Sequence, residues 1–234
     1  MILELHPGIQ MRRLEIGRER LPLLVIDNVV EDAERLVKRA VSRQFAPTTR
    51  FFPGVRAEAP LSYQHLIASR LRDALVECFN LRAKSFRFSM CHFSLVTTPP
   101  QQLVPIQRVP HVDSLASDGL ASIHYLFKNG FDGTAFYRHR QTGFESVDES
   151  RANVYFRLQE AERERMPAGT GYINGDTDEF EQIGRGEAVF NRMLIYRRNM
   201  LHSGCIGRDF VPDANPLTGR LSINSFFDPE PSRQ

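Results

Sequence analysis

Phe86-Arg87-Phe88-Ser89-Met90-Cys91-His92 is the stretch at which the hydrophobic pattern of this chain changes from a helical period to a strand period. Apolar and polar side chains alternate here, and a period of two predicts a β-strand over residues 86–97. Upstream, apolar residues recur at helical spacing in residues 31–43 and 63–79, after a short apolar strand at residues 21–27. The chain therefore begins with helices and continues with strands.

Short strands and turns dominate the rest of the chain. We expect strands at residues 121–127, 134–138, 188–196 and 220–227, and an exposed polar helix at residues 149–165. The first two strands are expected to form a pair, joined by a glycine-containing turn. Helices followed by many short strands indicate an α+β domain whose β part is a sandwich or jelly roll.

The length of 234 residues fits a single domain over residues 1–234. Within it we expect an N-terminal strand and supporting helices over residues 1–84, and a strand-rich core over residues 85–228. Residues 141–187 are longer and more charged than such a core requires. We therefore expect them to form an insertion that acts as a lid or a substrate-recognition element.

The composition is that of a globular protein, with 41% hydrophobic and 25% charged residues. The 30 basic and 28 acidic side chains give a net charge of +2, which provides no electrostatic footprint for nucleic acid. No run of 18 apolar residues is present and the N-terminus lacks the features of a signal peptide, so we expect no membrane span. The scattered cysteines Cys78, Cys91 and Cys205 indicate a reducing compartment, and we expect a cytoplasmic protein.

Two short motifs contain candidate metal ligands. Pro110-His111-Val112-Asp113 places a histidine and an aspartate two residues apart, and such residues point the same way in an extended chain. Farther along, His202 follows the apolar strand and precedes Ser203-Gly204, which places its imidazole at the rim of a sheet. Two imidazoles and one carboxylate on one face of an iron ion leave positions open for a chelating oxo-acid and then dioxygen.

Gly219-Arg220-Leu221-Ser222-Ile223-Asn224 is the third stretch that carries chemistry. Strand alternation puts Arg220 and Ser222 on the same face, opposite the apolar residues between them. An unpaired buried arginine is costly, and a bound dicarboxylate would give it a partner. A guanidinium matches a carboxylate with two parallel hydrogen bonds, and the hydroxyl of Ser222 can add a third.

The order of these motifs resembles the prolyl-4-hydroxylase-like branch of the 2-oxoglutarate/Fe(II)-dependent oxygenase superfamily, over roughly residues 21–227. The shared order is H-x-D, a Tyr-Leu strand, a glycine-turn strand, a distal histidine and an R-x-S strand. Val25-Ile26-Asp27-Asn28 followed by a helix also looks like the N-terminal support of that family. The resemblance implies a double-stranded β-helix, which is a distorted, cupin-like jelly roll with supporting helices.

The resemblance also implies roles for individual residues. The matches are His111, Asp113 and His202 to the iron ligands, Arg220 and Ser222 to the partners of the distal carboxylate of 2-oxoglutarate, and Tyr125 to a tyrosine that binds the same carboxylate. The implied reaction uses Fe(II) and O2, converts 2-oxoglutarate to succinate and carbon dioxide, and oxidises a C–H bond of a substrate. One departure is an insertion near residues 208–218, which lengthens the gap between the last histidine and the arginine.

Other functions fit parts of the pattern. A cupin-like metalloprotein acting without 2-oxoglutarate would keep the fold but would not need Arg220 and Ser222 on one inward face. A non-catalytic binding module would use the histidines and the aspartate structurally. A halogenase would carry a small residue in place of Asp113, so hydroxylation is favoured. The substrate stays open between a peptide, an amino acid and a small metabolite, and we expect no nucleic-acid or membrane partner.

The remaining polar residues have structural alternatives. The histidines His92, His124 and His139 are expected to be satisfied core or surface residues, and Cys205 is expected to be a small buried residue. The stretch Tyr137-Arg138-His139-Arg140 is either a substrate clamp or an exposed strand end.

Overall fold

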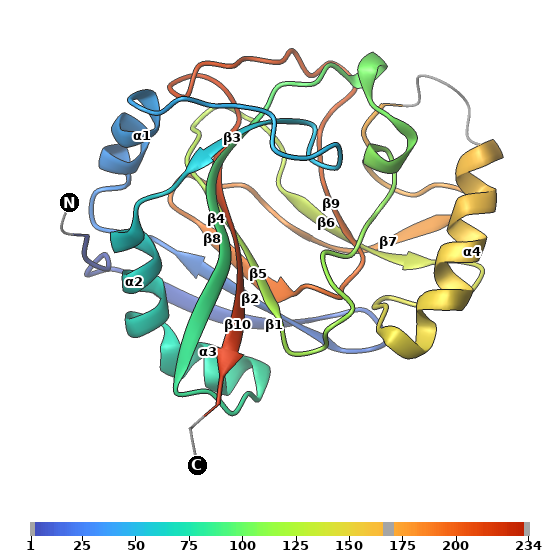
Figure 1. Cartoon of the computed structure of the whole chain (residues 1–234), viewed down its shortest axis with the longest axis horizontal. Helices are drawn as coiled ribbons and strands as arrows, with labels where there is room; N and C mark the ends of the chain where they lie inside the picture. The colour runs from blue at the N-terminus through green and yellow to red at the C-terminus, as the bar shows by residue number, and fades with distance from the viewer. Residues whose placement is uncertain (1–2, 166–170, 232–234) are drawn as a thin grey trace.

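The computed structural model describes residues 3–165 and 171–231 and contains two antiparallel sheets (Figure 1). The larger sheet has seven strands. Its strands lie in the order β1-β2-β8-β5-β10-β4-β3, and all neighbours are antiparallel. They are β1 (Gln10–Ile16), β2 (Leu21–Asp27), β3 (Gly54–Glu58), β4 (Ser85–Val96), β5 (Leu120–Tyr125), β8 (Met193–Arg197) and β10 (Leu221–Glu230).

A smaller antiparallel sheet has the order β7-β6-β9. Its strands are β6 (Thr134–His139), β7 (Phe180–Gly186) and β9 (His202–Gly204). The helices are α1 (Ala33–Val41), α2 (Leu61–Arg70), α3 (Arg72–Phe79) and α4 (Glu149–Arg165), with 3-10 turns at Pro100–Gln102 and Pro105–Gln107. In the described ranges, no helix has both the length and the apolar character that a membrane crossing requires.

Strand β2 shows how the layers are arranged. Leu24 and Ile26 join a core with residues of α1, α2 and α3, whereas Leu23 and Val25 pack on the other side with Phe136 of the smaller sheet. One apolar strand serves both layers because successive side chains point to opposite faces. Figure 1 shows α1 and α2 on one side of the molecule and α4 beside the smaller sheet on the other. The chain is thus a mixed α/β protein built on antiparallel sheets.

Helix α4 covers the outer face of the smaller sheet. Its buried residue Tyr155 shares a core with Tyr137 of β6. His139, also on β6 and fully buried, forms hydrogen bonds with Glu162 of α4 at 3.0 Å and with Thr142 at 2.8 Å. The helix predicted over residues 149–165 is therefore confirmed, but one of its faces is buried.

The strands predicted over residues 21–27 and 86–97 and the helix predicted over residues 31–43 are confirmed as β2, β4 and α1. The helix predicted over residues 63–79 consists of two helices, α2 and α3. They meet at Leu71, which ends α2 and precedes α3. The hydroxyl of Ser69 donates to the carbonyl of His65 at 2.6 Å, one turn earlier. Such a bond back to the preceding turn bends a helix, which accounts for the break.

The expected pairing of residues 121–127 with residues 134–138 is wrong. β5 pairs with β8 and β10 in the larger sheet, whereas β6 pairs with β7 and β9 in the smaller one. The connection between them therefore crosses from one sheet to the other. The strand expected from residue 188 begins only at Met193, because Asn191 adopts a left-handed conformation with φ 63°.

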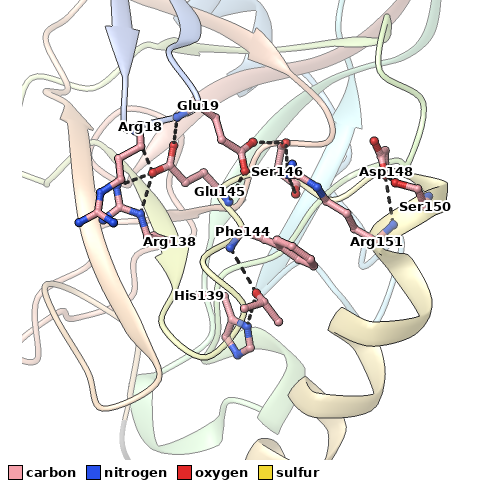
Figure 2. A network of polar contacts seen from close by, with 11 residues as sticks. Arg18, Glu19, Arg138, His139, Phe144, Glu145, Ser146, Asp148, Ser150 and Arg151 are labelled. Atoms are coloured by element: carbon pink, nitrogen blue, oxygen red, sulfur yellow. Dashed lines mark hydrogen bonds and ion pairs between the residues drawn. The ribbon is translucent and has the colours of Figure 1, made fainter.

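A buried carboxylate connects the β1–β2 hairpin to the segment after β6 (Figure 2). Glu145 is 1% exposed and accepts hydrogen bonds from the backbone N–H groups of Arg18 (2.9 Å) and Glu19 (2.8 Å). It also accepts from Nε of Arg138 (2.8 Å). Gly17 has φ 69°, and a Cβ atom there would lie 2.1 Å from the carboxylate of Glu145.

These contacts correct the interpretation of residues 137–140, because only Arg140, just after the end of β6, is exposed. The other three residues are buried, and among them Arg138 binds Glu145 and His139 binds Glu162. They are structural and do not form a substrate clamp. The two acids also anchor the proposed insertion at residues 141–187, of which residues 166–170 lie outside the described part. The lid role of this insertion stays a prediction.

His124 on β5 is a satisfied core histidine. It is fully buried and forms hydrogen bonds of 3.1 Å with the hydroxyl of Tyr63 and with Oδ1 of Asn191. Burial lowers the pKa of His124 to about 4, so the ring is neutral in the folded protein at neutral pH. The three cysteines are also buried, and all are free thiols.

Candidate metal centre

A short antiparallel bridge brings the two candidate histidines together. The backbone N–H of His111 donates to the carbonyl of His202 over 2.9 Å, and the N–H of His202 donates back over 3.0 Å. Asp113 is placed by its own backbone N–H, which donates to the carbonyl of Arg198 over 2.8 Å. Three side chains from two distant segments thus meet at the start of β9.

The three side chains converge on one point. Nε2 of His111 lies 3.6 Å from Oδ1 of Asp113, and Nε2 of His202 lies 3.4 Å from Oδ2 of the same carboxylate. All the candidate ligand atoms lie within 4.8 Å of one another. Because protein nitrogen and oxygen ligands typically lie about 2.0–2.2 Å from an ion such as zinc, the three groups fit around one metal ion of that size.

Hydrogen bonding and burial prepare His202 to act as a ligand. Its Nδ1 lies 2.9 Å from the carbonyl of Met200, so we assign the proton to Nδ1, which leaves the lone pair of Nε2 directed toward Asp113. Burial lowers the pKa of His202 to about 4, and the neutral ring is the form that binds metal. Burial also raises the pKa of Asp113, an effect that a bound cation would oppose.

Arg220 is a buried guanidinium without a carboxylate partner among the described residues. It is 3% exposed, and its Nη2 donates to the carbonyls of Asp132 (2.8 Å) and Gly133 (2.9 Å). Its Nε is buried with no hydrogen-bond partner. Burial lowers the pKa of Arg220, as expected for a cation removed from water. The side chain therefore keeps donors free for an anion.

The candidate ligands and Arg220 line one cavity of about 520 Å³. Asp113, His202 and Thr134 form part of its wall, and aromatic side chains from the larger sheet, from α4 and from loops form much of the rest. The aromatic residues are Phe51, Phe52, Tyr155, Phe156, Tyr172, Tyr196 and Phe226. The arrangement offers a metal site and an anion site in a single, largely apolar space, which is typical of small-molecule sites.

A larger groove of about 1030 Å³ lies beside α1, and its wall includes Arg35, Lys38, Arg39 and Arg43. It contains none of the three candidate ligands. We therefore place the functional site in the smaller cavity, where metal ligands and an unpaired buried cation occur together.

The structure places Tyr125 and Ser222 behind the wall of this cavity. The hydroxyl of Tyr125 forms a 2.8 Å hydrogen bond with Oγ1 of Thr134, and Ser222 donates to Oδ1 of Asn224 over 2.7 Å. Thr134 and Asn224 line the cavity, whereas Tyr125 and Ser222 do not. The structure thus brings His111, Asp113, His202 and Arg220 together and puts the other two predicted residues one contact away.

Sequence reasoning missed Thr134 and Arg56, which both line the cavity. Thr134 is the first residue of β6 and follows Gly133, whose carbonyl accepts from Arg220. Arg56 lies on the edge strand β3, between two prolines, where no alternation of apolar residues predicts a strand. No motif in the sequence indicates that either residue belongs to a functional site.

The fold is similar to that of HygX in two solved structures. HygX from Streptomyces hygroscopicus with nickel, 2-oxoglutarate and hygromycin B bound has a TM-score of 0.52 and 10% identity, and the match covers 91% of this chain and 87% of that one. A structure of HygX with nickel and 2-oxoglutarate gives the same TM-score and coverage at 11% identity. At such low identity the likeness shows the fold alone.

Sequence comparison identifies the family. No curated protein matches the chain. A family model described as a family of unknown function, DUF6445, matches residues 7–227, which is nearly the whole chain. This range includes every helix of the described chain, every strand except the last residues of β10, and every residue of the candidate metal centre. The chain therefore belongs to the DUF6445 family.

Proposed function

We propose that this protein is an Fe(II)- and 2-oxoglutarate-dependent dioxygenase that hydroxylates a C–H bond of a small molecule, an amino acid or a peptide. One observation carries the proposal: His111, Asp113 and His202 share a cavity with Arg220, a buried guanidinium whose Nε has no partner in the described chain. A metal site beside an unpaired cation is what a chelating dicarboxylate requires.

The donor set fits iron. Two neutral imidazoles and one carboxylate form the facial triad typical of non-haem Fe(II) oxygenases, and they leave coordination positions open. Iron(II), when bound, supplies the activation of dioxygen. His202 is held in the ligating tautomer by Met200, and Asp113 removes one unit of net charge without closing the site. The presence of Asp113 favours hydroxylation over halogenation.

Arg220 is the proposed anchor of the distal carboxylate of 2-oxoglutarate. A guanidinium forms two parallel hydrogen bonds with a carboxylate, and the hydroxyl of Thr134 in the same cavity can add another. We assign Tyr125 a supporting role, because its hydroxyl bonds to Thr134 and fixes the orientation of that side chain. Ser222 acts in this scheme through Asn224. The nickel and 2-oxoglutarate bound to HygX support this ligand pair.

The two facing sheets support a more specific fold. We assign them to a double-stranded β-helix with α1, α2 and α3 as supporting helices, in the prolyl-4-hydroxylase-like branch of the superfamily. The order of motifs along the chain and the likeness of the fold to HygX support this assignment. We also place the protein in the cytoplasm, because its three cysteines are free and form no disulfide.

Turnover of 2-oxoglutarate tests the proposal. The iron-loaded protein should convert 2-oxoglutarate to succinate in the presence of O2, slowly without substrate, and the His202→Ala variant should not. An iron-bound protein that neither binds nor consumes 2-oxoglutarate would instead be a cupin-like metalloprotein. A protein that binds no metal ion at all would instead be a non-catalytic binding module.

A further inference from the structure

Arg56 is a second guanidinium in the cavity, and the proposed function does not use it. It lies on β3 opposite Ser94 of β4, and its guanidinium carbon lies 4.1 Å from the ring centre of Phe52. Its Nε is buried with no hydrogen-bond partner, and burial lowers its pKa. Arg56 forms no ion pair with a carboxylate of the described chain, and Asp113, the acid that acts on it through space, is a proposed metal ligand.

The charges of the cavity do not balance without a further anion. Its charged side chains, within the described chain, are Arg56, Asp113 and Arg220, because His111 and His202 are neutral imidazoles when they bind a metal ion. In the proposed function a divalent ion and the 2-oxoglutarate dianion cancel, and Asp113 offsets only one of the two guanidinium groups. Arg220 is already assigned to the co-substrate. The charge of Arg56 is then left over. A partly desolvated cation is costly to leave unpaired, so the loaded cavity favours one more negative group.

We propose that Arg56 binds the substrate, and that this substrate is a small organic acid whose carboxylate forms a bidentate pair with the guanidinium. This inference rests on the proposed function and adds a substrate class to it. A carboxylate carries a single negative charge, which matches the surplus charge of the cavity. A phosphate ester carries about −1.5 to −2 charges at pH 7 and would exceed it. The planar fork of arginine also matches a carboxylate geometrically.

The rest of the wall defines the body of such an acid. Phe52 contacts Arg56 directly, and the cavity is further lined by Tyr155 and Phe156 of α4 and by Phe226 of β10. A volume of about 520 Å³ that is shared with 2-oxoglutarate leaves space for a small molecule. The substrate is therefore an acid with an apolar or aromatic body, held at one end by Arg56.

The test measures binding of 3-phenylpropanoate and of its uncharged amide. Full-length protein is loaded with manganese(II) and saturating 2-oxoglutarate without oxygen, and each probe is titrated by calorimetry. The wild type should bind the acid roughly ten- to a hundredfold more tightly than the amide. Arg56→Gln should abolish this preference, and Arg56→Lys should restore part of it, because a point charge lacks the fork. Arg50→Gln is the matched control, since Arg50 is exposed and lies outside the cavity wall.

The same variants separate this inference from the proposed function. Arg56→Gln should bind 2-oxoglutarate as tightly as the wild type; weaker binding would mean that Arg56 holds the co-substrate, and the inference would be overturned. Equal affinity of the wild type for acid and amide would also overturn it, as would tighter binding of 3-phenylpropyl phosphate than of the acid. A wild type that binds no 2-oxoglutarate contradicts the proposed function instead.

Discussion

Replacing Arg220 with alanine removes the guanidinium that we assign to the distal carboxylate of 2-oxoglutarate. The side chain is 3% exposed and lies in the cavity that contains the metal ligands. Its Nη2 is already occupied by the carbonyls of Asp132 and Gly133, which fix its position, while its Nε is unpaired. The substitution therefore removes a positioned charge and leaves the metal ligands in place.

The magnitude follows from the kind of contact that is lost. A hydrogen bond to a charged group contributes about 1.5–3 kcal/mol, and a charge-assisted contact in this largely apolar cavity belongs at the upper end of that range. About 3 kcal/mol corresponds to roughly a hundredfold weaker binding of 2-oxoglutarate. Arg220→Lys should recover only part of the affinity, because an ammonium group cannot reproduce the planar fork.

The assay is calorimetric titration of 2-oxoglutarate into manganese-loaded protein. Metal binding should be unchanged in Arg220→Ala, since Arg220 is not a ligand. Arg208→Ala is a suitable control, because Arg208 is an exposed arginine in the loop before β10. Unchanged affinity for 2-oxoglutarate in a folded, metal-loaded Arg220→Ala variant would refute the assignment. Arg138 is not an alternative anchor, because Glu145 and Glu181 already bind it.

Three other outcomes follow from the structure. Alanine at His111, Asp113 or His202 should abolish stoichiometric Fe(II) binding in metal analysis, and full occupancy in all three variants would exclude this site. The pKa of His124 is about 4 in the folded protein, below the value of about 6.5 in the unfolded chain, so the unfolded chain binds the proton at a higher pH than the folded protein does. The free energy of unfolding should therefore fall by up to about 3 kcal/mol as the pH drops from about 6.5 to 4. Urea unfolding of His124→Gln should depend less on pH, and an unchanged slope would contradict this. Gly17→Ala should destabilise the protein about 1–2 kcal/mol more than Gly143→Ala, because both glycines have positive φ but only Gly17 faces a carboxylate. Equal losses in thermal unfolding would argue against the role of that contact.

The grouping of the candidate ligands could be predicted from the sequence because it depends on local geometry. His111 and Asp113 are two residues apart in extended chain, and the structure places both beside His202. Arg220 directly precedes a strand whose alternate residues face inward, so its burial next to the site could also be predicted from the sequence. Their roles toward iron and 2-oxoglutarate stay predictions.

The depth of a side chain behind the cavity wall could not be predicted in the same way. Strand alternation says that Tyr125 faces the interior, but Thr134 on the next strand lies between its hydroxyl and the cavity. That neighbour depends on the crossing from the larger sheet to the smaller one, which local sequence patterns do not encode. The position of Arg56 could not be predicted for a related reason. It lies on the short edge strand β3, which is defined by its pairing with β4 and not by its own residues.

A crystal of the protein soaked without oxygen in iron(II) and 2-oxoglutarate tests the central claim most directly. We predict one iron ion bound to Nε2 of His111, Nε2 of His202 and the carboxylate of Asp113, with the distal carboxylate of 2-oxoglutarate paired with Arg220. Iron bound elsewhere, or 2-oxoglutarate bound away from Arg220 and the metal, would contradict it.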